Sequence, residues 1–310
     1  MSTALTFAHC TQKSVAIQPK LMYSNDMRLS LCQLFAAMSG DNECNAEYTD
    51  FAAAGNDQGE LFDSPDKREI RFSEQDMADF AVVIAAHSSG MDLAILPPNA
   101  RRLFELSVNA FEAIVHAWMS ELSITAEIIR FGKKVLAAVD MTHNAGPETA
   151  QRQAAETAAA DRGDPDVRTV LEAAYKVWHE VHRLLGLLRF CPNEDGVYIA
   201  HCEPSHFTLP GLGPHFRERF GQTPWAIIDE KRRFCMRCSG GTDGTGVSGE
   251  TLEIFNIDKN PGFLKAPPDS EWENLWRHYH KTINNESRNN PDLQRRFMPK
   301  RYWKYLTELS

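Results

Sequence analysis

Three histidines and one aspartate in the second half of the chain are the side chains best suited to acid–base or metal chemistry. Seven of the eleven histidines follow residue 178. The candidates for a catalytic group are His182, His206, His215 and Asp229. Imidazole ionises near neutral pH, and a carboxylate can orient an imidazole or share a cation with it. These residue types predict a hydrolase or nuclease that activates water, whereas a histidine on an apolar helix stripe, such as His182, is also typical of a core.

Other motifs in the chain are incomplete, so they exclude several chemistries. His179 and His182 stand three apart around Glu180, whereas a zinc-protease helix places its two histidines four apart. Cys235 and Cys238 form a single CxxC pair without the second pair of a zinc knuckle. The sequence contains no three-cysteine radical-SAM motif, no iron–sulfur spacing and no GxxxxGK phosphate loop. It therefore assigns no metal ligands and no cofactor.

Arginines, lysines and aromatic residues gather toward the carboxyl end. The last fifteen residues, 296–310, contain four cationic and four aromatic residues around Pro299. Cations can pair with phosphates while aromatic faces accept stacked bases, which predicts a nucleic-acid-binding surface. Its candidates are Arg183, Arg189, Arg219, Arg232, Arg288, Arg296, Lys300, Arg301, Tyr302 and Trp303. Alternatively, a terminal helix docks its aromatics on a sheet and leaves its cations in water.

Composition describes a globular protein of 310 residues, with 43% hydrophobic residues, 24% charged residues and a formal net charge of −9. The acidity is concentrated in the first half, since residues 171–310 hold 19 Lys or Arg against 18 Asp or Glu. A local basic face is therefore compatible with the overall charge. The seven cysteines, the absence of a signal-peptide pattern at the start and the lack of a long apolar run predict a cytoplasmic protein without disulfides or membrane spans.

Helical patterns dominate the first half of the chain. Residues 1–70 are poorly defined and partly irregular, with one short helix expected within 27–38. Residues 71–163 predict a helical region, in which one helix follows Ser73 and a long helix runs from Asn99 to about Leu122. A further helix holds Ile124 to Val135, and residues 142–163 are typical of a linker or an exposed helix.

The region 164–310 predicts an α+β domain. Asp164 and Pro165 begin a helix whose apolar stripe includes Tyr175, Trp178 and His182, and which ends at Gly186. Period-two segments then predict a mostly antiparallel sheet, with strands at 187–190, 197–202, 225–228, 234–238 and 251–257. The histidines at 206 and 215 flank a Pro- and Gly-rich segment typical of a loop. A helix starting at Ser270 buries its apolar face, and short helical pieces surround Pro299. The fold class is α+β, with an amino-terminal helical region, a central sheet and carboxy-terminal helices.

An ordered set of short motifs covers residues 165–310. They read Glu180-Val-His182-Arg183, Arg189-Phe190, Pro204-Ser-His206, His215-Phe-Arg-Glu-Arg219-Phe220, Trp225-Ala-Ile-Ile-Asp229, Arg288-Asn-Asn-Pro-Asp-Leu-Gln294 and Phe297 to Trp303. In this order the motifs resemble a bacterial family of DNA-metabolism proteins of unknown function. The members accompany a radical-SAM partner or occur fused behind uracil-DNA glycosylases. Residues 1–70 lack the glycine-containing start of that family, and the chain carries no glycosylase motif.

Three functions follow from these observations. The resemblance implies a DNA-binding protein that acts in repair or modification beside an enzyme partner, either a radical-SAM protein or a uracil-DNA glycosylase. The histidine set predicts a hydrolase or nuclease instead. The apolar helices of the first half are compatible with a protein–protein adaptor that breaks no bond.

Overall fold

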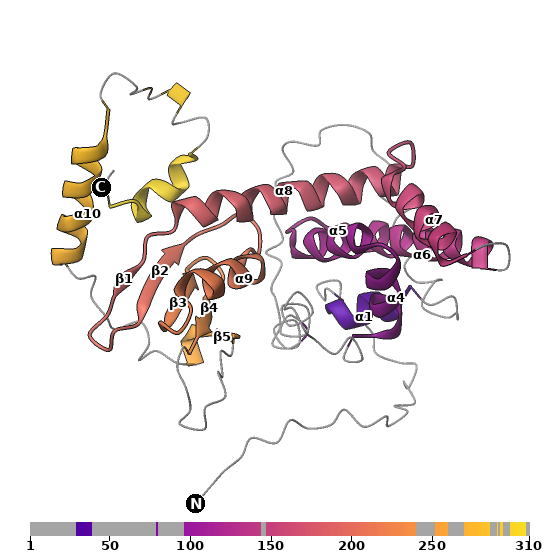
Figure 1. Ribbon diagram of the computed structural model, residues 1–310, viewed down its shortest axis with the longest axis horizontal. Coiled ribbons are helices and arrows are strands. Elements are labelled where there is room, and N and C mark those ends of the chain that lie inside the picture. The colour runs from indigo at the N-terminus through magenta and orange to yellow at the C-terminus, as the bar shows by residue number, and fades with distance from the viewer. Residues whose placement is uncertain are drawn as a thin grey trace, which may run out of the picture.

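Helices at both ends of the chain enclose a five-stranded sheet, which confirms the predicted α+β class (Figure 1). The computed structural model describes residues 29–38, 79, 96–143, 147–239, 252–259, 270–285, 290, 292–293 and 298–307. The helix predicted after Ser73 lies outside these residues, apart from position 79. None of the described helices is both long and apolar enough to cross a bilayer.

The amino-terminal part consists of α1 (Leu31–Ala36), α4 (Pro98–Leu106), α5 (Val108–Met119), α6 (Thr125–His143) and α7 (Glu148–Ala160). The single long helix predicted from Asn99 was wrong, because it is broken at Ser107. Ser107 is extended, and its side chain accepts a hydrogen bond from the Ala110 amide (3.0 Å), which caps α5. Asn99 lies inside α4 and donates to the Phe35 carbonyl (2.9 Å), so it fastens α1 instead of capping a helix.

Helix α7 occupies most of the segment predicted as a linker or an exposed helix. It packs against α6, with Ala155 and Ala159 buried in the contact. Small side chains let two helices approach closely, so alanine-rich composition here marks a packed helix and the linker alternative was wrong.

The longest helix, α8 (Pro165–Leu187), spans from the helical group to the sheet (Figure 1). Its predicted start is confirmed, since Asp164 accepts hydrogen bonds from the amides of Asp166 (2.8 Å) and Val167 (3.3 Å). The predicted apolar stripe was wrong for Tyr175, Trp178 and His182, which are exposed. The buried face consists of smaller residues at helical spacing, namely Val167, Val170, Ala173, Ala174, Val177, Val181 and Leu184, together with Glu180. Tyr175 and Trp178 instead lie on the exposed face.

The sheet has the order β1-β2-β3-β4-β5. Its strands are β1 (Cys191–Pro192), β2 (Tyr198–Cys202), β3 (Trp225–Asp229), β4 (Phe234–Cys238) and β5 (Leu252–Asn256). Every neighbouring pair is antiparallel except β2 and β3, which pair in parallel with Tyr198 opposite Trp225. The predicted strand at 187–190 was wrong, because α8 extends to Leu187 and β1 begins only at Cys191.

Helix α9 (Leu209–Phe220) provides the crossover between the parallel strands, where the sequence predicted a loop. Its glycines permit close packing. A Cβ on Gly211 would stand 2.9 Å from Val181 of α8, and one on Gly213 would stand 3.0 Å from Met236 of β4. The glycines therefore allow α9 to lie between α8 and the sheet, and they do not mark a flexible segment.

The carboxyl-terminal elements are η2 (Ile257–Lys259), α10 (Ser270–Ile283) and the 3-10 helix η5 (Lys300–Tyr305). Helix α10 lies beside the carboxyl-terminal end of α8 (Figure 1). Its predicted buried face was wrong for Leu275, Tyr279 and Ile283, which are all more than half exposed.

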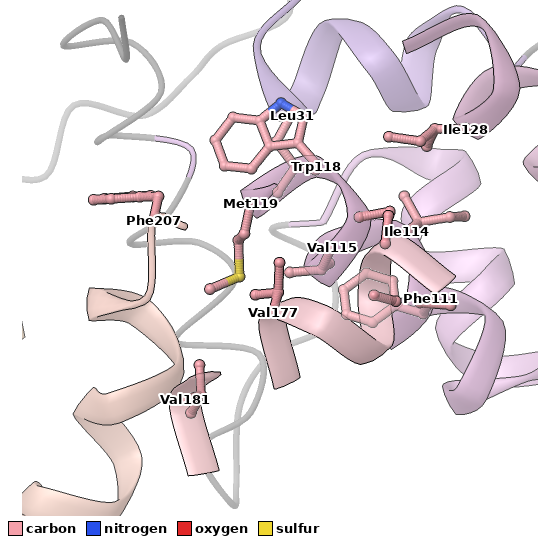
Figure 2. Packing of buried hydrophobic residues seen from close by; sticks show 14 of the residues in the cluster. Leu31, Phe111, Ile114, Val115, Trp118, Met119, Ile128, Val177, Val181 and Phe207 are labelled. Carbon is pink, nitrogen blue, oxygen red and sulfur yellow. The ribbon is translucent and has the colours of Figure 1, made fainter. Parts of the chain in front are cut away.

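The largest hydrophobic cluster joins α1, the helices α4 to α9, the sheet and Tyr302. Figure 2 shows Val177 of α8 next to Val115 of α5. The Phe207 amide also donates to the Met119 carbonyl (3.1 Å), which ties the segment before α9 to the end of α5. Helix α8 is therefore fixed along its inner face, while Tyr175 and Trp178 on its outer face are exposed.

Candidate functional site

The outer face of α8 carries a row of stacked rings. Tyr175 and Trp178 stack at 6.4 Å between ring centroids, and Trp178 stacks on His182 at 5.5 Å with the ring planes only 5° apart. Tyr175 is 59% exposed and Trp178 is 49% exposed. Residues three and four apart share one face of a helix, so this aromatic row of Tyr175, Trp178 and His182 continues toward Leu185 and Gly186.

Two cations flank the aromatic row on one side. Lys176 and Arg183 stand seven residues apart on α8, which places them on a common face, and Lys176 is exposed whereas Arg183 is half-buried. The carboxylate of Glu172 lies on the same side and opposes them electrostatically. The row thus offers flat apolar surfaces beside a small excess of positive charge.

A cavity of about 420 Å³ lies at the carboxyl-terminal end of the row. Its lining comes from the end of α8, from β1 and β2, from α9 and from α10, and consists of Leu185, Gly186, Leu188, Arg189, Phe190, Cys191, Tyr198, Arg219, Phe220, Trp276 and Thr307. Arg189 stacks over the Trp276 ring at 5.1 Å from the centroid, so the segment that follows α8 meets α10 at this cavity.

The inner face of α8 carries a buried carboxylate that joins three segments of the chain. Glu180, only 3% exposed, accepts hydrogen bonds from the amides of Ser205 and His206, both at 2.8 Å. It also accepts from Arg301 Nη2 (2.9 Å) and from the Tyr302 hydroxyl. Glu180 therefore holds the segment before α9 and the terminal 3-10 helix against α8.

The charges of this network follow from its contacts. Burial alone would raise the pKa of Glu180, but the hydrogen bonds from Tyr302 and the two amides outweigh burial and lower it. Burial and the adjacent carboxylate together raise the pKa of Tyr302. Burial opposes protonation of Arg301, yet Tyr302 and Glu180 raise its pKa. The site therefore contains an ionised carboxylate, a neutral phenol and a guanidinium.

Arg232 holds the same segment from the other side. It is 6% exposed and donates from Nη1 to Asp229 (2.7 Å), from Nη2 to the Ser205 carbonyl (2.8 Å) and from Nη2 to Glu121. Burial raises the pKa of the Asp229 carboxyl, and the Arg232 charge opposes that rise. Glu180 accepts hydrogen bonds from amides of the 203–206 segment, and Arg232 donates hydrogen bonds to its carbonyls. Two side chains of opposite charge therefore fix the backbone around His206.

The structure brings only two of the four predicted catalytic residues into this network. Asp229 and His206 are joined through Arg232 and the 203–206 segment. Burial lowers the pKa of His206, with Glu180 and Glu121 opposing, so its imidazole is neutral at pH 7. His182 belongs to the aromatic row, and His215 is exposed on α9. Among the described residues, no hydrogen bond or ring contact joins either of them to His206 or Asp229.

A metal site is not preformed in the described part of the chain, since no group of three His, Cys, Asp or Glu side chains there could hold an ion. The acid–base role of His206 remains a prediction.

The predicted nucleic-acid residues fall into separate places. Arg183 flanks the aromatic row, and Arg189 and Arg219 line the cavity. Arg232, Arg301 and Tyr302 belong to the buried network, where the 2% exposure of Tyr302 leaves no ring face for a base. Trp303 donates from its indole to the Met298 carbonyl (2.9 Å), and Lys300 is exposed. Arg288 and Arg296 lie outside the described residues.

Sequence reasoning missed the functional potential of Tyr175, Trp178 and Trp276, because large aromatic residues at helical spacing were interpreted as core. A second apolar stripe in the same segment could have shown that these aromatic residues of α8 face outward. It consists of smaller residues at helical spacing that fill the inner face of α8, namely Val167, Val170, Ala174, Val177, Val181 and Leu184.

Comparison with models of known protein families assigns this chain to a family. Residues 141–308, more than half of the chain, match the family model of a domain of unknown function, DUF4130. The chain belongs to the DUF4130 family. The matched DUF4130 region includes α8, the cavity and the Glu180 network. It starts at the end of α6, whereas the domain boundary predicted from the sequence lies at residue 164. No curated protein and no solved structure matches the chain.

Proposed function

We propose that the chain binds single-stranded nucleic acid along the outer face of α8, with DNA as the preferred strand. The observation that carries this proposal is the exposed, stacked row of Tyr175, Trp178 and His182 that leads into a cavity lined by two arginines. A contiguous group of exposed aromatic rings is typical of a surface that binds a ligand or partner.

Single strands suit this surface because their bases present flat faces and their phosphates carry charge. Bases stacked on aromatic side chains contribute about 1–3 kcal/mol each. Lys176 and Arg183 lie along one side of the row, where a strand's phosphates would follow its bases. From Tyr175 to Gly186 the helix rises about 16 Å, which accommodates a short stretch of a strand.

The resemblance to DNA-metabolism proteins supports DNA over RNA as the strand. The same resemblance supports a role beside an enzyme partner, a radical-SAM protein or a uracil-DNA glycosylase, with this chain holding the strand. Neither partner is needed for the strand-binding proposal to be tested.

The test measures fluorescence anisotropy of labelled single-stranded DNA, single-stranded RNA and duplex DNA across a salt series. Replacing Trp178 by alanine removes one stacking platform, and we expect the dissociation constant to rise about 5- to 150-fold. The matched control is Met141→Ala, which removes another exposed apolar side chain, from α6, and should leave affinity unchanged. Equal affinities of the two variants would refute the proposal.

The charges beside the row provide a second readout. We expect Arg183→Ala to weaken binding and to reduce the slope of log K against log salt by about 0.7, the contribution of one phosphate contact on a single strand. Glu172→Gln should strengthen binding, because it removes the opposing carboxylate. Affinity that is independent of salt would instead indicate an apolar protein ligand.

A protein-docking function is the second candidate, and a different surface favours it. Leu275, Tyr279 and Ile283 stand four apart on α10 and are 59%, 51% and 58% exposed, which gives that helix an apolar outer stripe. If this adaptor function holds, Leu275→Ser with Ile283→Ser, which adds no charge, would abolish pull-down of a specific partner and leave DNA affinity unchanged.

A further inference from the structure

The cavity at the end of the aromatic row has walls of two kinds. One wall is aromatic, with Phe190 against Phe220 at 4.8 Å and Tyr198 against Phe220 at 5.5 Å between centroids. Trp276 of α10 contributes a further ring. A volume of about 420 Å³ lies within the range of small-ligand pockets, which are mostly apolar with a few placed polar groups. These walls suit a planar ring.

The placed polar groups are two guanidinium groups. Arg189 is held in position by donation from Nη1 to the Gly186 carbonyl (2.9 Å) and by its contact with the Trp276 ring. Arg219 projects from the last turn of α9, is exposed and forms no ion pair with any described residue. None of the lining residues, all within the described part of the chain, carries a carboxylate. The described lining of the cavity therefore contributes two guanidinium groups and no carboxylate.

We propose that this cavity binds one nucleotide, with its base against the aromatic wall and its phosphate paired with Arg189 and Arg219. Guanidinium groups pair with phosphate oxygens through two parallel hydrogen bonds, and both arginines line this cavity. The proposal rests on the strand-binding function, since Leu185 and Gly186 bring the cavity to within one helical turn of His182. A strand lying on the row would thus place one unstacked nucleotide in the cavity.

The test uses the full chain and four mononucleotides, dAMP, dCMP, dGMP and dTMP, in isothermal titration calorimetry. Inorganic phosphate probes the two arginines alone, and thymidine probes the aromatic wall alone. We expect the mononucleotides to bind more tightly than either probe alone. Arg219→Ala should weaken mononucleotide binding about tenfold or more, and Arg219→Lys should weaken it less. The control is Arg168→Ala, an exposed arginine near the start of α8, about 27 Å along the helix from Gly186.

The variants separate this proposal from the strand-binding function. Trp178→Ala should weaken the oligonucleotide and leave the mononucleotide unchanged, whereas Arg219→Ala should weaken both. If oligonucleotides bind through Trp178 but no mononucleotide binds and Arg219→Ala changes nothing, the cavity proposal is overturned and strand binding stands. Mononucleotide binding that is equal in Arg219→Ala and Arg168→Ala would also overturn it.

Discussion

Replacing Glu180 by alanine tests the buried network directly. Three donors would lose their acceptor inside the protein, namely the amides of Ser205 and His206 and the hydroxyl of Tyr302. The Arg301 side chain is 42% exposed, so water can replace part of its lost interaction. A buried donor left unsatisfied costs about 1–3 kcal/mol, and removing one partner from a buried ionic network costs about 3–5 kcal/mol. We therefore expect Glu180→Ala to lower the free energy of unfolding by about 3–5 kcal/mol.

Glu180→Gln is the milder form of the same perturbation. Its side-chain oxygen can still accept hydrogen bonds, whereas its amide group places a donor against the remaining donors. We expect a loss of about 2–3 kcal/mol, between the alanine variant and the wild type. Both losses are large beside a typical total stability of about 5–15 kcal/mol.

Urea unfolding followed by tryptophan fluorescence measures these differences. The midpoint should fall while the denaturant dependence stays constant, because the folded and unfolded surfaces change little. Glu172→Ala is the matched control, since Glu172 is exposed on the same helix and its loss should change stability by less than about 0.5 kcal/mol. A Glu180→Ala loss as small as that of the control would show that the carboxylate does not hold the three segments together.

Three further outcomes follow from the structure. The folded-state pKa of Glu180 lies below its ordinary value of 4.5, so the stabilisation by its carboxylate is complete well above pH 4.5 and is lost as the pH falls through the lower pKa. In acid unfolding experiments, the free energy of unfolding of Glu180→Gln should therefore fall less steeply with decreasing pH than that of the wild type. Gly211→Ala should cost about 1–3 kcal/mol in urea unfolding, because the added methyl would stand 2.9 Å from a valine of α8, whereas Gly186→Ala, with open space around it, should not. Burial raises the pKa of Cys235 to about 12, so iodoacetamide at pH 8 should label the half-buried Cys191 before Cys235, as peptide mass spectrometry would show, and equal labelling of the two in the native state would contradict this.

Local signals in the sequence were sufficient for several elements. Asp164 and Pro165 specified the start of α8, because a side-chain cap and a fixed φ act within one turn. Period-two patterns located β2, β3, β4 and β5 to within two residues, since alternation of side chains is a property of each strand alone.

Packing decided what local signals left ambiguous. The glycines of α9 were interpreted as a loop, but they are the residues that let this helix approach Val181 and Met236. The inner face of α8 was assigned to its aromatic residues, because hydrophobicity alone favours Tyr175 and Trp178 over valine and alanine. In the structure the smaller side chains face α5 and α9, where close packing of helices excludes large rings.

The sequence by itself determined the residue types of the site, the α+β class and, through residues 141–308, the membership in the DUF4130 family. It could not determine which of those residues meet, because Glu180, Ser205 and Tyr302 are brought together only when α8, the segment before α9 and the terminal 3-10 helix fold onto one another. Tertiary structure also decided which face of α8 is exposed, and with it whether its aromatic residues fill the core or face the solvent. The physical reason is that burial depends on the fit between distant surfaces, which no local spacing of residues encodes.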